Sequence, residues 1–484
     1  MGNDTSAQKI TSGLVWTFAE RIAAQVVSTV VSIILARLLD PEHYGIISIV
    51  MIFISICNIF VSDGFGKALV QKKEADKLDF DSMFWMGLSV SAVLYLILYV
   101  AAPIIADFYD MALLSSVIRI LGIRLVLTSV NTIQQAYVQR RMEFKKFFIA
   151  TLFGTAVSAV VGIVMAYEGF GVWALVAQYM TNTTIDTIVL FLTCGWRPGF
   201  NFSGNRLKAM MPFTAKVLAQ SIVYTAEDNI RSFIVGKRFG SADLAFYNKG
   251  KQFPQLIITN LNTSIGKVML PAVAKSQDNL EACKNMTRKA ISVGMYILCP
   301  AMVGFCAIGD TFVSVLLTDK WLTAAPYLRI FCIAYLTRPF ETSSSSALLA
   351  IGRSDITLKN MIIVNATALA TVLIAVFWFE NVLLIAVGTL VSAAVSIGLY
   401  SHNMQKCLNY SVREQIADCM PFILASVGMA AVVWVMHFIP MNKVLLMLIQ
   451  IIVGAGVYIG VSKLFKIKEF DWVCQYAGKF LKRK

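Results

Sequence analysis

The sequence predicts an all-α polytopic membrane protein, and its composition and apolar pattern carry that prediction. Of the 484 residues, 57% are hydrophobic and only 14% are charged, and the mean hydropathy is +0.70. Soluble chains average roughly 45–50% apolar and about 25% charged residues. The apolar residues run along the whole chain in blocks long enough to cross a bilayer as helices. No soluble domain of useful size is left between the blocks.

Polar breaks divide the apolar residues into fourteen candidate membrane-spanning helices. The first has no clear small-residue cleavage site, so it is expected to be a retained span rather than a secretory signal peptide. An even number of spans places both ends of the chain on one side of the membrane. The candidate spans lie at approximately 11–36, 44–66, 82–106, 113–137, 148–167, 170–194, 208–236, 243–271, 290–317, 324–351, 360–379, 382–404, 419–439 and 443–463.

The Lys and Arg residues predict which side that is. They concentrate in the chain ends and in the loops after even-numbered spans, so the positive-inside rule places both termini in the cytoplasm. This placement explains most of the net charge of +14 without nucleic acid as a partner. The basic tail is expected to lie against anionic membrane lipids. The opposite loops hold only Arg37, Lys237, Arg238, Lys320 and Lys443.

A weak internal repeat relates the first six spans to the next six. Arg21-Ile-Ala-Ala-Gln25 resembles Lys216-Val-Leu-Ala-Gln220. Both halves begin in the cytoplasm, so the repeat is parallel, about an axis along the membrane normal. The prediction is two pseudo-symmetric six-helix lobes and two further C-terminal helices. The N-lobe comprises residues 1–194, and a cytoplasmic linker at 195–207 connects it to the C-lobe at 208–404. Spans 13 and 14 lie within 405–464, and the basic cytoplasmic tail comprises 465–484.

Polar side chains form stripes along spans 1, 2, 4, 7, 8 and 10. In span 4, Arg124, Thr128, Asn131 and Gln135 recur at helical spacing and share one face. A charge within the hydrocarbon costs roughly 2.5–3.5 kcal/mol on insertion scales, so such stripes face protein or water. Isolated polar residues can also join helices, at about 0.6 kcal/mol each. Stripes on equivalent spans of both halves favour one shared hydrated cavity.

Basic residues outnumber acidic residues in these stripes, which predicts an anionic substrate. Arginine suits phosphate oxygens through its planar fork, and the amides and hydroxyls suit a sugar chain. Internal ion pairs are expected to neutralise part of the positive charge. The candidate substrate-binding residues are Arg21, Gln25, Arg124, Asn131, Lys216, Gln220, Tyr224, Lys249, Lys251, Gln255 and Arg338.

The motifs of the sequence predict neither catalysis nor a metal site. There is no P-loop and no Ser/His/Asp or Cys/His set, and the nine Cys and three His are scattered. No cofactor is expected, and the chain is not predicted to be an enzyme. The stripes also hold acidic residues that either form structural ion pairs or couple transport to a proton or sodium gradient. They are Glu20, Glu227, Asp228 and Glu341.

Four segments resemble one known family. They are 34–45 (Ile-Leu-Ala-Arg-Leu-Leu-Asp-Pro-Glu-His-Tyr-Gly), 64–71, the outer-loop segment 319–330 and 347–353. These segments resemble Wzx-type polysaccharide flippases, most closely the branch that includes the colanic acid exporter. That family belongs to the superfamily of the lipid II flippase MurJ and the MATE drug exporters. The resemblance implies a two-lobed, fourteen-helix fold that works by alternating access.

The same resemblance implies the substrate and its surroundings. Undecaprenyl-pyrophosphate-linked oligosaccharide repeat units would be flipped from the cytoplasmic to the periplasmic leaflet, for exopolysaccharide or O-antigen assembly. The location is then the bacterial inner membrane. The expected partners are the lipid-linked oligosaccharide, membrane lipids, and the polysaccharide polymerase and chain-length machinery. The pyrophosphate would meet the basic residues, and the apolar spans 13 and 14 would line a groove for the polyprenyl tail.

Two other functions stay open from the sequence. A MATE-like, cation-coupled exporter of small molecules is the main alternative, although that class typically has twelve spans and acidic cavity residues. The third is a membrane polymerase or ligase acting on lipid-linked sugars. Such enzymes tend to have large periplasmic loops, whereas the outer loops here are short.

Overall fold

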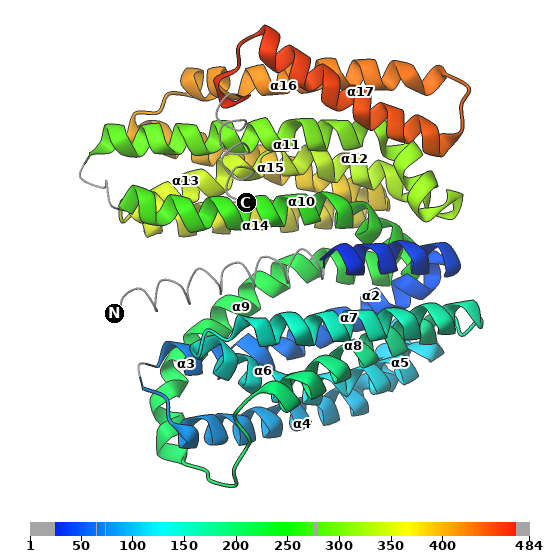
Figure 1. The fold of residues 1–484 in the computed structure, drawn as a ribbon, viewed down its shortest axis with the longest axis vertical. Coiled ribbons are helices and arrows are strands. Elements are labelled where there is room, and N and C mark those ends of the chain that lie inside the picture. The colour runs from blue at the N-terminus through cyan, green and yellow to red at the C-terminus, as the bar shows by residue number, and fades with distance from the viewer. Residues whose placement is uncertain (1–24, 64, 73, 275–278, 471–484) are drawn as a thin grey trace. The chain divides into compact units, whose positions relative to one another are not determined.

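The computed structural model describes residues 25–63, 65–72, 74–274 and 279–470, and within them it is helical with no strand (Figure 1). The chain divides into two compact units, Met1–Ala245 and Phe246–Lys484. The predicted all-α membrane fold is confirmed. The helices follow the apolar segments because only a helix satisfies its own backbone hydrogen bonds inside a membrane.

The helices of the first unit correspond to predicted spans 1 to 7, and span 1 is described from residue 25 onward. The first described helix is Gln25–Leu38. The others are α2 (Pro41–Asn58), the π-helix η1 (Ile59–Asp63), α3 (Phe65–Gln71), α4 (Lys77–Phe108), α5 (Ala112–Gly122), α6 (Arg124–Arg140), α7 (Phe144–Tyr167), α8 (Val172–Thr193) and α9 (Gly204–Phe239).

The helices of the second unit coincide with predicted spans 8 to 14. The first of them, α10, has its first five residues in the first unit. The helices are α10 (Ser241–Ala274), α11 (Leu280–Leu317), the 3-10 turn η2 (Asp319–Trp321), α12 (Ala324–Tyr335), α13 (Arg338–Ala350), α14 (Ser354–Ile374), the π-helix η3 (Ala375–Phe379), α15 (Val382–Leu408), α16 (Val412–Val435), the 3-10 turn η4 (Met436–Phe438) and α17 (Lys443–Leu464).

Nine helices in the described part of the chain are long and apolar enough to cross a membrane. Predicted spans 6, 7 and 8, now α8, α9 and α10, are not among them because of their polar and charged residues. The described part of span 1, Gln25–Leu38, is too short. Predicted span 10 is split into two short helices, α12 and α13. Each predicted span therefore has a helical counterpart, and the count of fourteen crossings stays a prediction.

Capping explains why some helices begin before their apolar segments. Asp76 accepts a hydrogen bond from the backbone N–H of Asp79 (3.0 Å), and the Asp79 carboxylate accepts one from the N–H of Asp76 (3.1 Å). Ser411 and Glu414 form the same reciprocal capping box at the start of α16. Such boxes satisfy N–H groups that the first helical turn leaves unpaired. Polar residues thereby extend α4 and α16 beyond the spans predicted from hydropathy.

Spans 4 and 10, which the repeat relates, are both interrupted. Span 4 breaks at Ile123, between α5 and α6, and span 10 breaks at Leu336 and Thr337, between α12 and α13. An arginine opens the second helix in each case, Arg124 in α6 and Arg338 in α13. The breaks place these two candidate binding residues at the ends of short helices inside the predicted spans.

Glycines allow two close helix crossings. A Cβ atom on Gly45 would lie 1.9 Å from the carbonyl oxygen of Ser241, so α2 meets the first residue of α10 backbone to backbone. A Cβ atom on Gly250 would lie 2.5 Å from the Cβ of Tyr327, at the crossing of α10 and α12. Only glycine fits either position without moving a neighbouring helix.

The long helix α9 is joined to α4 at both of its ends. Arg206 Nη2 lies 3.1 Å from Asp76 Oδ2 at one end, and Lys237 Nζ lies 3.3 Å from Asp110 Oδ2 at the other. The repeat assigns this helix to the C-lobe at 208–404, whereas its contacts and the boundary of the compact units place it with the first unit. The division into two six-helix lobes stays a prediction from the sequence.

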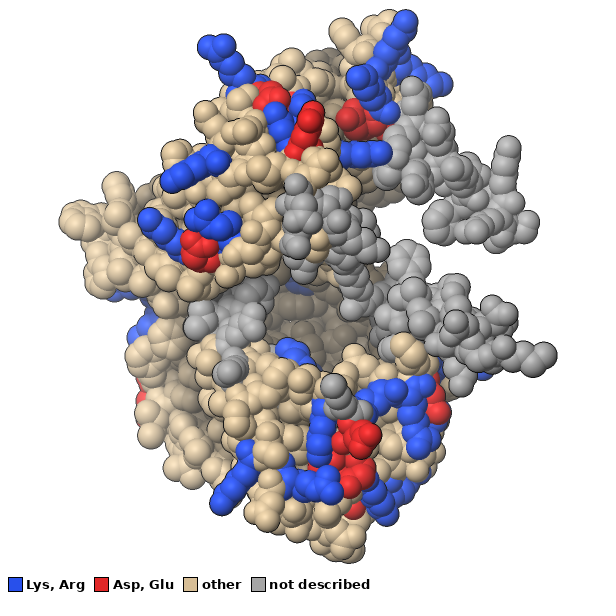
Figure 2. Space-filling view, turned by 90° about the vertical axis from the view of Figure 1, so that its left-hand side faces the viewer, with Lys and Arg blue, Asp and Glu red and all other residues tan. Residues whose placement is uncertain are grey.

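The two C-terminal helices are built into the second unit. Arg288 of α11 donates from Nε to Asp418 Oδ2 of α16 at 2.8 Å. The hydroxyl of Tyr458 on α17 donates to the carbonyl of Tyr296 on α11 at 2.9 Å. Figure 2 views the second unit from the end where α11 begins and shows Lys and Arg on it with acidic residues among them. This is the end that the loop charges predict to be cytoplasmic.

Candidate functional site

Arg124 carries a positive charge within a predicted span and is held by neutral groups. Its Nε donates to the hydroxyl of Thr183 on α8 at 2.9 Å, and its guanidinium carbon lies 5.2 Å from the ring centroid of Tyr179. Its Nη1 lies 3.5 Å from the sulfur of Met51 on α2. No acidic residue in the described part of the chain forms an ion pair with this partly exposed side chain. The guanidinium therefore keeps hydrogen-bonding capacity for an anion.

Asn131, two turns further along α6, is buried against α8. Its Nδ2 donates to Asp186 Oδ2 at 2.8 Å and to the hydroxyl of Thr187 at 3.3 Å. Its Oδ1 accepts a hydrogen bond from Gln135 Nε2 at 2.6 Å. The polar face predicted on span 4 thus exists, and at these positions it joins α6 to α8.

Asp186 is a residue that the sequence reasoning missed. It is partly exposed, and among the described residues it has no ion pair with a Lys or Arg. Span 6 was not among the predicted polar stripes, although Gln178, Asn182 and Asp186 recur every four residues along it. The usable signal was the rarity of a carboxylate within an otherwise uncharged span, at 170–194.

Arg338 forms an ion pair with one of the candidate coupling acids. Its Nη1 lies 3.0 Å from Glu341 Oε2, one turn along α13. The second carboxylate oxygen of Glu341 accepts a hydrogen bond from the hydroxyl of Thr337 at 2.7 Å. The guanidinium carbon of Arg338 lies 5.8 Å from the ring centroid of Tyr335. The positive charge that opens α13 is therefore neutralised locally, unlike that of Arg124.

The basic residues on α10 point in different directions. Lys249 is buried, and its Nζ lies 5.7 Å from the ring centroid of Trp321. Lys251 and Gln255, one turn apart, are partly exposed. Positions two residues apart lie on opposite sides of a helix. Lys249 therefore faces the interior of the second unit, and Lys251 with Gln255 forms a different polar face.

The remaining candidates are described only in part. Gln25 is partly exposed at the start of the first described helix and lies 3.4 Å from the hydroxyl of Thr29. Arg21 and Glu20 lie outside the described residues. The backbones of five more candidates belong to α9, but their side chains also lie outside what the structure describes. These are Lys216, Gln220, Tyr224, Glu227 and Asp228.

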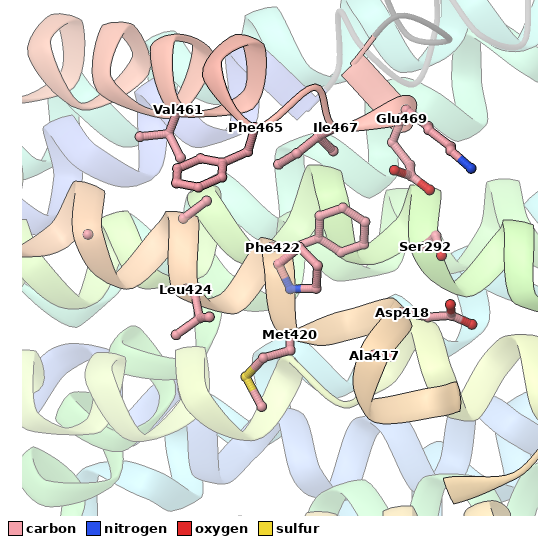
Figure 3. Close-up of a pocket in the computed structure, with 14 residues that line it drawn as sticks. Ser292, Ala417, Asp418, Met420, Phe422, Leu424, Val461, Phe465, Ile467 and Glu469 are labelled. Carbon is pink, nitrogen blue, oxygen red and sulfur yellow. The ribbon is translucent and has the colours of Figure 1, made fainter. Parts of the chain in front are cut away.

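An apolar pocket of about 850 Å³ lies between α11, α16 and α17 in the second unit (Figure 3). Asp418 and Glu469 are at one end of it, and Leu424 and Val461 are at the other. Apolar side chains such as Phe422 form most of the wall. Lys468 also lines the pocket, so the charged end holds both signs of charge.

A second pocket, of about 460 Å³, lies further along the same three helices. Its lining includes Pro300 and Phe312 from α11, Met429 from α16 and Ile451 from α17. The two pockets follow α16 and α17, which are the helices of predicted spans 13 and 14. We call them together the C-terminal groove.

Comparison with known proteins decides the family. Residues 34–326 match the model of the family described as polysaccharide biosynthesis protein. This chain belongs to that family. The resemblance found in the sequence motifs is thereby confirmed.

Several polysaccharide biosynthesis proteins are similar over most of this chain. The lipopolysaccharide biosynthesis protein WzxC of Escherichia coli (strain K12) is 24% identical over 355 residues, covering 73% of this chain and 72% of WzxC. The teichuronic acid biosynthesis protein TuaB of Bacillus subtilis (strain 168) is also 24% identical over 355 residues, covering 72% and 73%. The succinoglycan biosynthesis transport protein ExoT of Rhizobium meliloti (strain 1021) is 22% identical, covering 68% and 67%.

Two solved structures share the fold of this polysaccharide biosynthesis family member. The lipid II flippase MurJ in an inward closed conformation matches with a TM-score of 0.73 and 14% identity, covering 94% of this chain and 98% of MurJ. An inward-facing MATE multidrug transporter matches with a TM-score of 0.64 and 15% identity, covering 80% and 96%. The predicted MurJ and MATE type of fold is confirmed.

Proposed function

We propose that this protein flips undecaprenyl-pyrophosphate-linked oligosaccharide repeat units from the cytoplasmic to the periplasmic leaflet by alternating access. The product would supply exopolysaccharide or O-antigen assembly. The observation that carries the proposal is Arg124, a cation within a predicted span whose described partners are all neutral. Membership of the polysaccharide biosynthesis family and the fold of a lipid II flippase support the substrate class.

The surroundings of Arg124 suit a pyrophosphate. A charged side chain within a bilayer is costly, so it is retained where it has a function or a partner. Thr183 takes only the Nε–H, and the sulfur of Met51 is a weak acceptor for one terminal nitrogen. The guanidinium fork can therefore donate two parallel hydrogen bonds to phosphate oxygens. Arg338 is less suited to bind pyrophosphate, because it already forms an ion pair with Glu341.

The C-terminal groove supports the predicted site for the polyprenyl tail. Its wall is apolar, so a hydrocarbon chain buried in it is removed from water at about 25 cal/mol for each Å². Its charged end, at Asp418, Lys468 and Glu469, lies where α16 begins. In the proposal, this end is cytoplasmic and the pyrophosphate end of the lipid approaches it first.

The proposal includes the cellular setting expected from the sequence. The protein works in the bacterial inner membrane with both termini in the cytoplasm, and the polymerase and chain-length machinery use its product. Transport is coupled to a proton or sodium gradient. Glu341 is poorly suited to coupling because both of its oxygens already accept hydrogen bonds. Glu20, Glu227 and Asp228 stay the candidates.

One observation favours a second function. The fold is also that of a MATE multidrug transporter, which supports export of small cations as the alternative. The positive charge of Arg124, whose described partners are all neutral, counts against small-cation export, because a cationic substrate would be repelled there. Drug sensitivity of a deletion strain, with normal surface polysaccharide, would favour the exporter.

The test is complementation of a strain that lacks this gene. Arg124→Ala is expected to lower surface polysaccharide about tenfold or more, in line with losing a charged hydrogen bond of 1.5–3 kcal/mol. Arg124→Lys is expected to restore part of it. Arg353→Ala is the control, because Arg353 forms an exposed ion pair with Asp355. Normal export by Arg124→Ala at normal protein level would contradict the proposal.

A further inference from the structure

We infer that Asn131 is a positioning residue: its amide holds the Asp186 carboxyl group and so prevents that group from neutralising Arg124. The inference rests on the proposed function, because the charge of Arg124 matters only to an anionic substrate. It assigns a role to two residues, Asn131 and Asp186, that need not touch the substrate.

The orientation of the Asn131 amide is fixed by its neighbours. Gln135 donates to Asn131 Oδ1, so the nitrogen side of the amide faces α8 and donates to Asp186 and Thr187. Asn131 is only 4% exposed, so water cannot take over its hydrogen bonds. Thr187 is also buried and donates its own hydroxyl to the carbonyl of Thr183 at 2.7 Å. The Asn131 amide therefore has a fixed orientation, with its N–H group directed at the Asp186 carboxyl group.

Asp186 lies one helical turn along α8 from Thr183, the residue that accepts a hydrogen bond from Arg124 of α6. Residues three apart share one face of a helix, so the Asp186 side chain lies next to the position that Arg124 contacts. Opposite unit charges attract strongly where solvent is scarce. The long, flexible side chain of Arg124 could therefore reach the Asp186 carboxyl group if that group were released. In the described part of the chain neither residue has an ion-pair partner, so an Arg124–Asp186 pair would displace no described ion pair.

The other described groups that contact Arg124 or Asp186 carry no formal charge. Tyr179 comes from α8 itself and Met51 from α2. From α7, Gly154 lies against Asp186, because a Cβ built on it would be 3.3 Å from the Asp186 Cβ. From α6, Asn131 and Gln135 supply amides. The Asn131–Asp186 hydrogen bond is therefore the contact that competes with an Arg124–Asp186 ion pair.

Loss of the Asn131 amide has a consequence that differs from loss of packing. Asp186 would be released toward Arg124, and the positive charge would be cancelled although both charged residues remain. If the charge of Asp186 were removed as well, no carboxylate at position 186 could neutralise Arg124. A defect caused by Asn131 replacement is thus expected to be repaired by Asp186→Asn.

The experiment uses the full chain purified in detergent, with inorganic pyrophosphate as the probe and calorimetry as the readout. Asn131→Leu replaces the amide with a side chain of similar volume. It is expected to raise the Kd for pyrophosphate about tenfold, because a neutralised Arg124 would lose a charged hydrogen bond to the ligand. Asp186→Asn alone is expected to bind as the wild type does. The double variant Asn131→Leu/Asp186→Asn is expected to return within about twofold of the wild type.

The outcomes separate the inference from the proposed function. Wild-type affinity in Asn131→Leu, or a double variant as weak as Asn131→Leu, overturns the positioning role. A wild-type protein that binds no pyrophosphate, or binds it as well with Arg124→Ala, overturns the proposed anion site and the inference with it. Thermal unfolding checks that each variant is folded, and Asn131→Ala replaces Asn131→Leu where the larger side chain is not accommodated.

Discussion

Asp79 is fully buried, and its Oδ1 lies 2.6 Å from the Nζ of Lys72. The same oxygen lies 3.4 Å from Nη1 of Arg206 at the start of α9, and Oδ2 accepts the backbone N–H of Asp76. One buried carboxylate therefore joins the segment after α3 to the starts of α4 and α9. Asp79 thus links three segments at this end of the first unit, alongside the Arg206–Asp76 ion pair.

Replacing Asp79 should destabilise that end. Asp79→Asn leaves Lys72 and Arg206 without their shared buried partner, and breaking a buried pair costs roughly 3–5 kcal/mol. Lys72 and Arg206 are partly exposed, so about 2 kcal/mol is expected. Unfolding of the purified protein in detergent measures it. Asp355→Asn, which breaks the exposed pair with Arg353, is expected to leave Tm unchanged, and equal shifts in both variants would contradict the prediction.

The crossing of α10 and α12 should not accept a side chain at Gly250. Gly250→Ala places a methyl group 2.5 Å from the Tyr327 Cβ and 2.8 Å from the Leu328 nitrogen, so the helices must separate. Overpacking of this kind costs typically about 1–3 kcal/mol. Gly266→Ala is the matched control on the same helix, because nothing lies within 4 Å of the new Cβ. It is expected to be neutral or slightly stabilising, since alanine favours helix. The unfolding temperatures of the two variants, measured in detergent, test this prediction, and equal values would contradict it.

Filling the C-terminal groove should weaken binding of a polyprenyl chain. Gly428 lines the larger pocket, and nothing lies within 4 Å of a Cβ built on it. Gly428→Leu therefore occupies pocket volume with little clash and is expected to raise the Kd for undecaprenyl phosphate severalfold. Gly398→Leu on α15 is the control, because that position is also open but does not line the groove. Equal binding by both variants would show that the tail lies elsewhere.

The contact between Asp319 and Lys443 should weaken in acid. A hydrogen bond from the Ser314 hydroxyl, and then the Lys443 ammonium at 3.1 Å, hold the pKa of Asp319 below its ordinary value. A carboxylate with a lowered folded-state pKa contributes stability above the unfolded-state pKa of about 3.9 and loses it as the pH falls through the folded-state pKa. The difference in Tm between wild type and Asp319→Asn is expected to be small, constant from about pH 5 to 7, and absent below the folded-state pKa. A difference that grows on acidification would contradict the assignment.

The span positions could be predicted from the sequence almost completely. Predicted span 12 at 382–404 is α15 (Val382–Leu408), and predicted span 14 at 443–463 is α17 (Lys443–Leu464). Hydropathy fails where polar residues continue a helix, as at the start of α4, where Asp76 and Asp79 form a capping box. Side-chain capping is a local signal, but it lies outside the apolar segment that defines a span.

The candidate site was predictable only in part. The Arg338–Glu341 pair was an expected alternative, because residues three apart face each other on a helix. Lys249 and Lys251 were grouped together by sign, and the structure separates them because they lie on opposite sides of α10. Asp186 was missed, because its partner Asn131 lies 55 positions away in the sequence.

The sequence by itself determined the membrane fold class, the placement of the helices and the family, because these depend on local hydropathy and on motifs read along the chain. Only the tertiary structure decided which charges are compensated. Arg124 and Arg338 look alike in the sequence, because each is an arginine within spans 4 and 10, which the repeat relates. Compensation depends on distances of a few ångströms between helices. Packing of α6 against α8 gives Arg124 neutral partners, whereas α13 gives Arg338 a carboxylate within its own first turn.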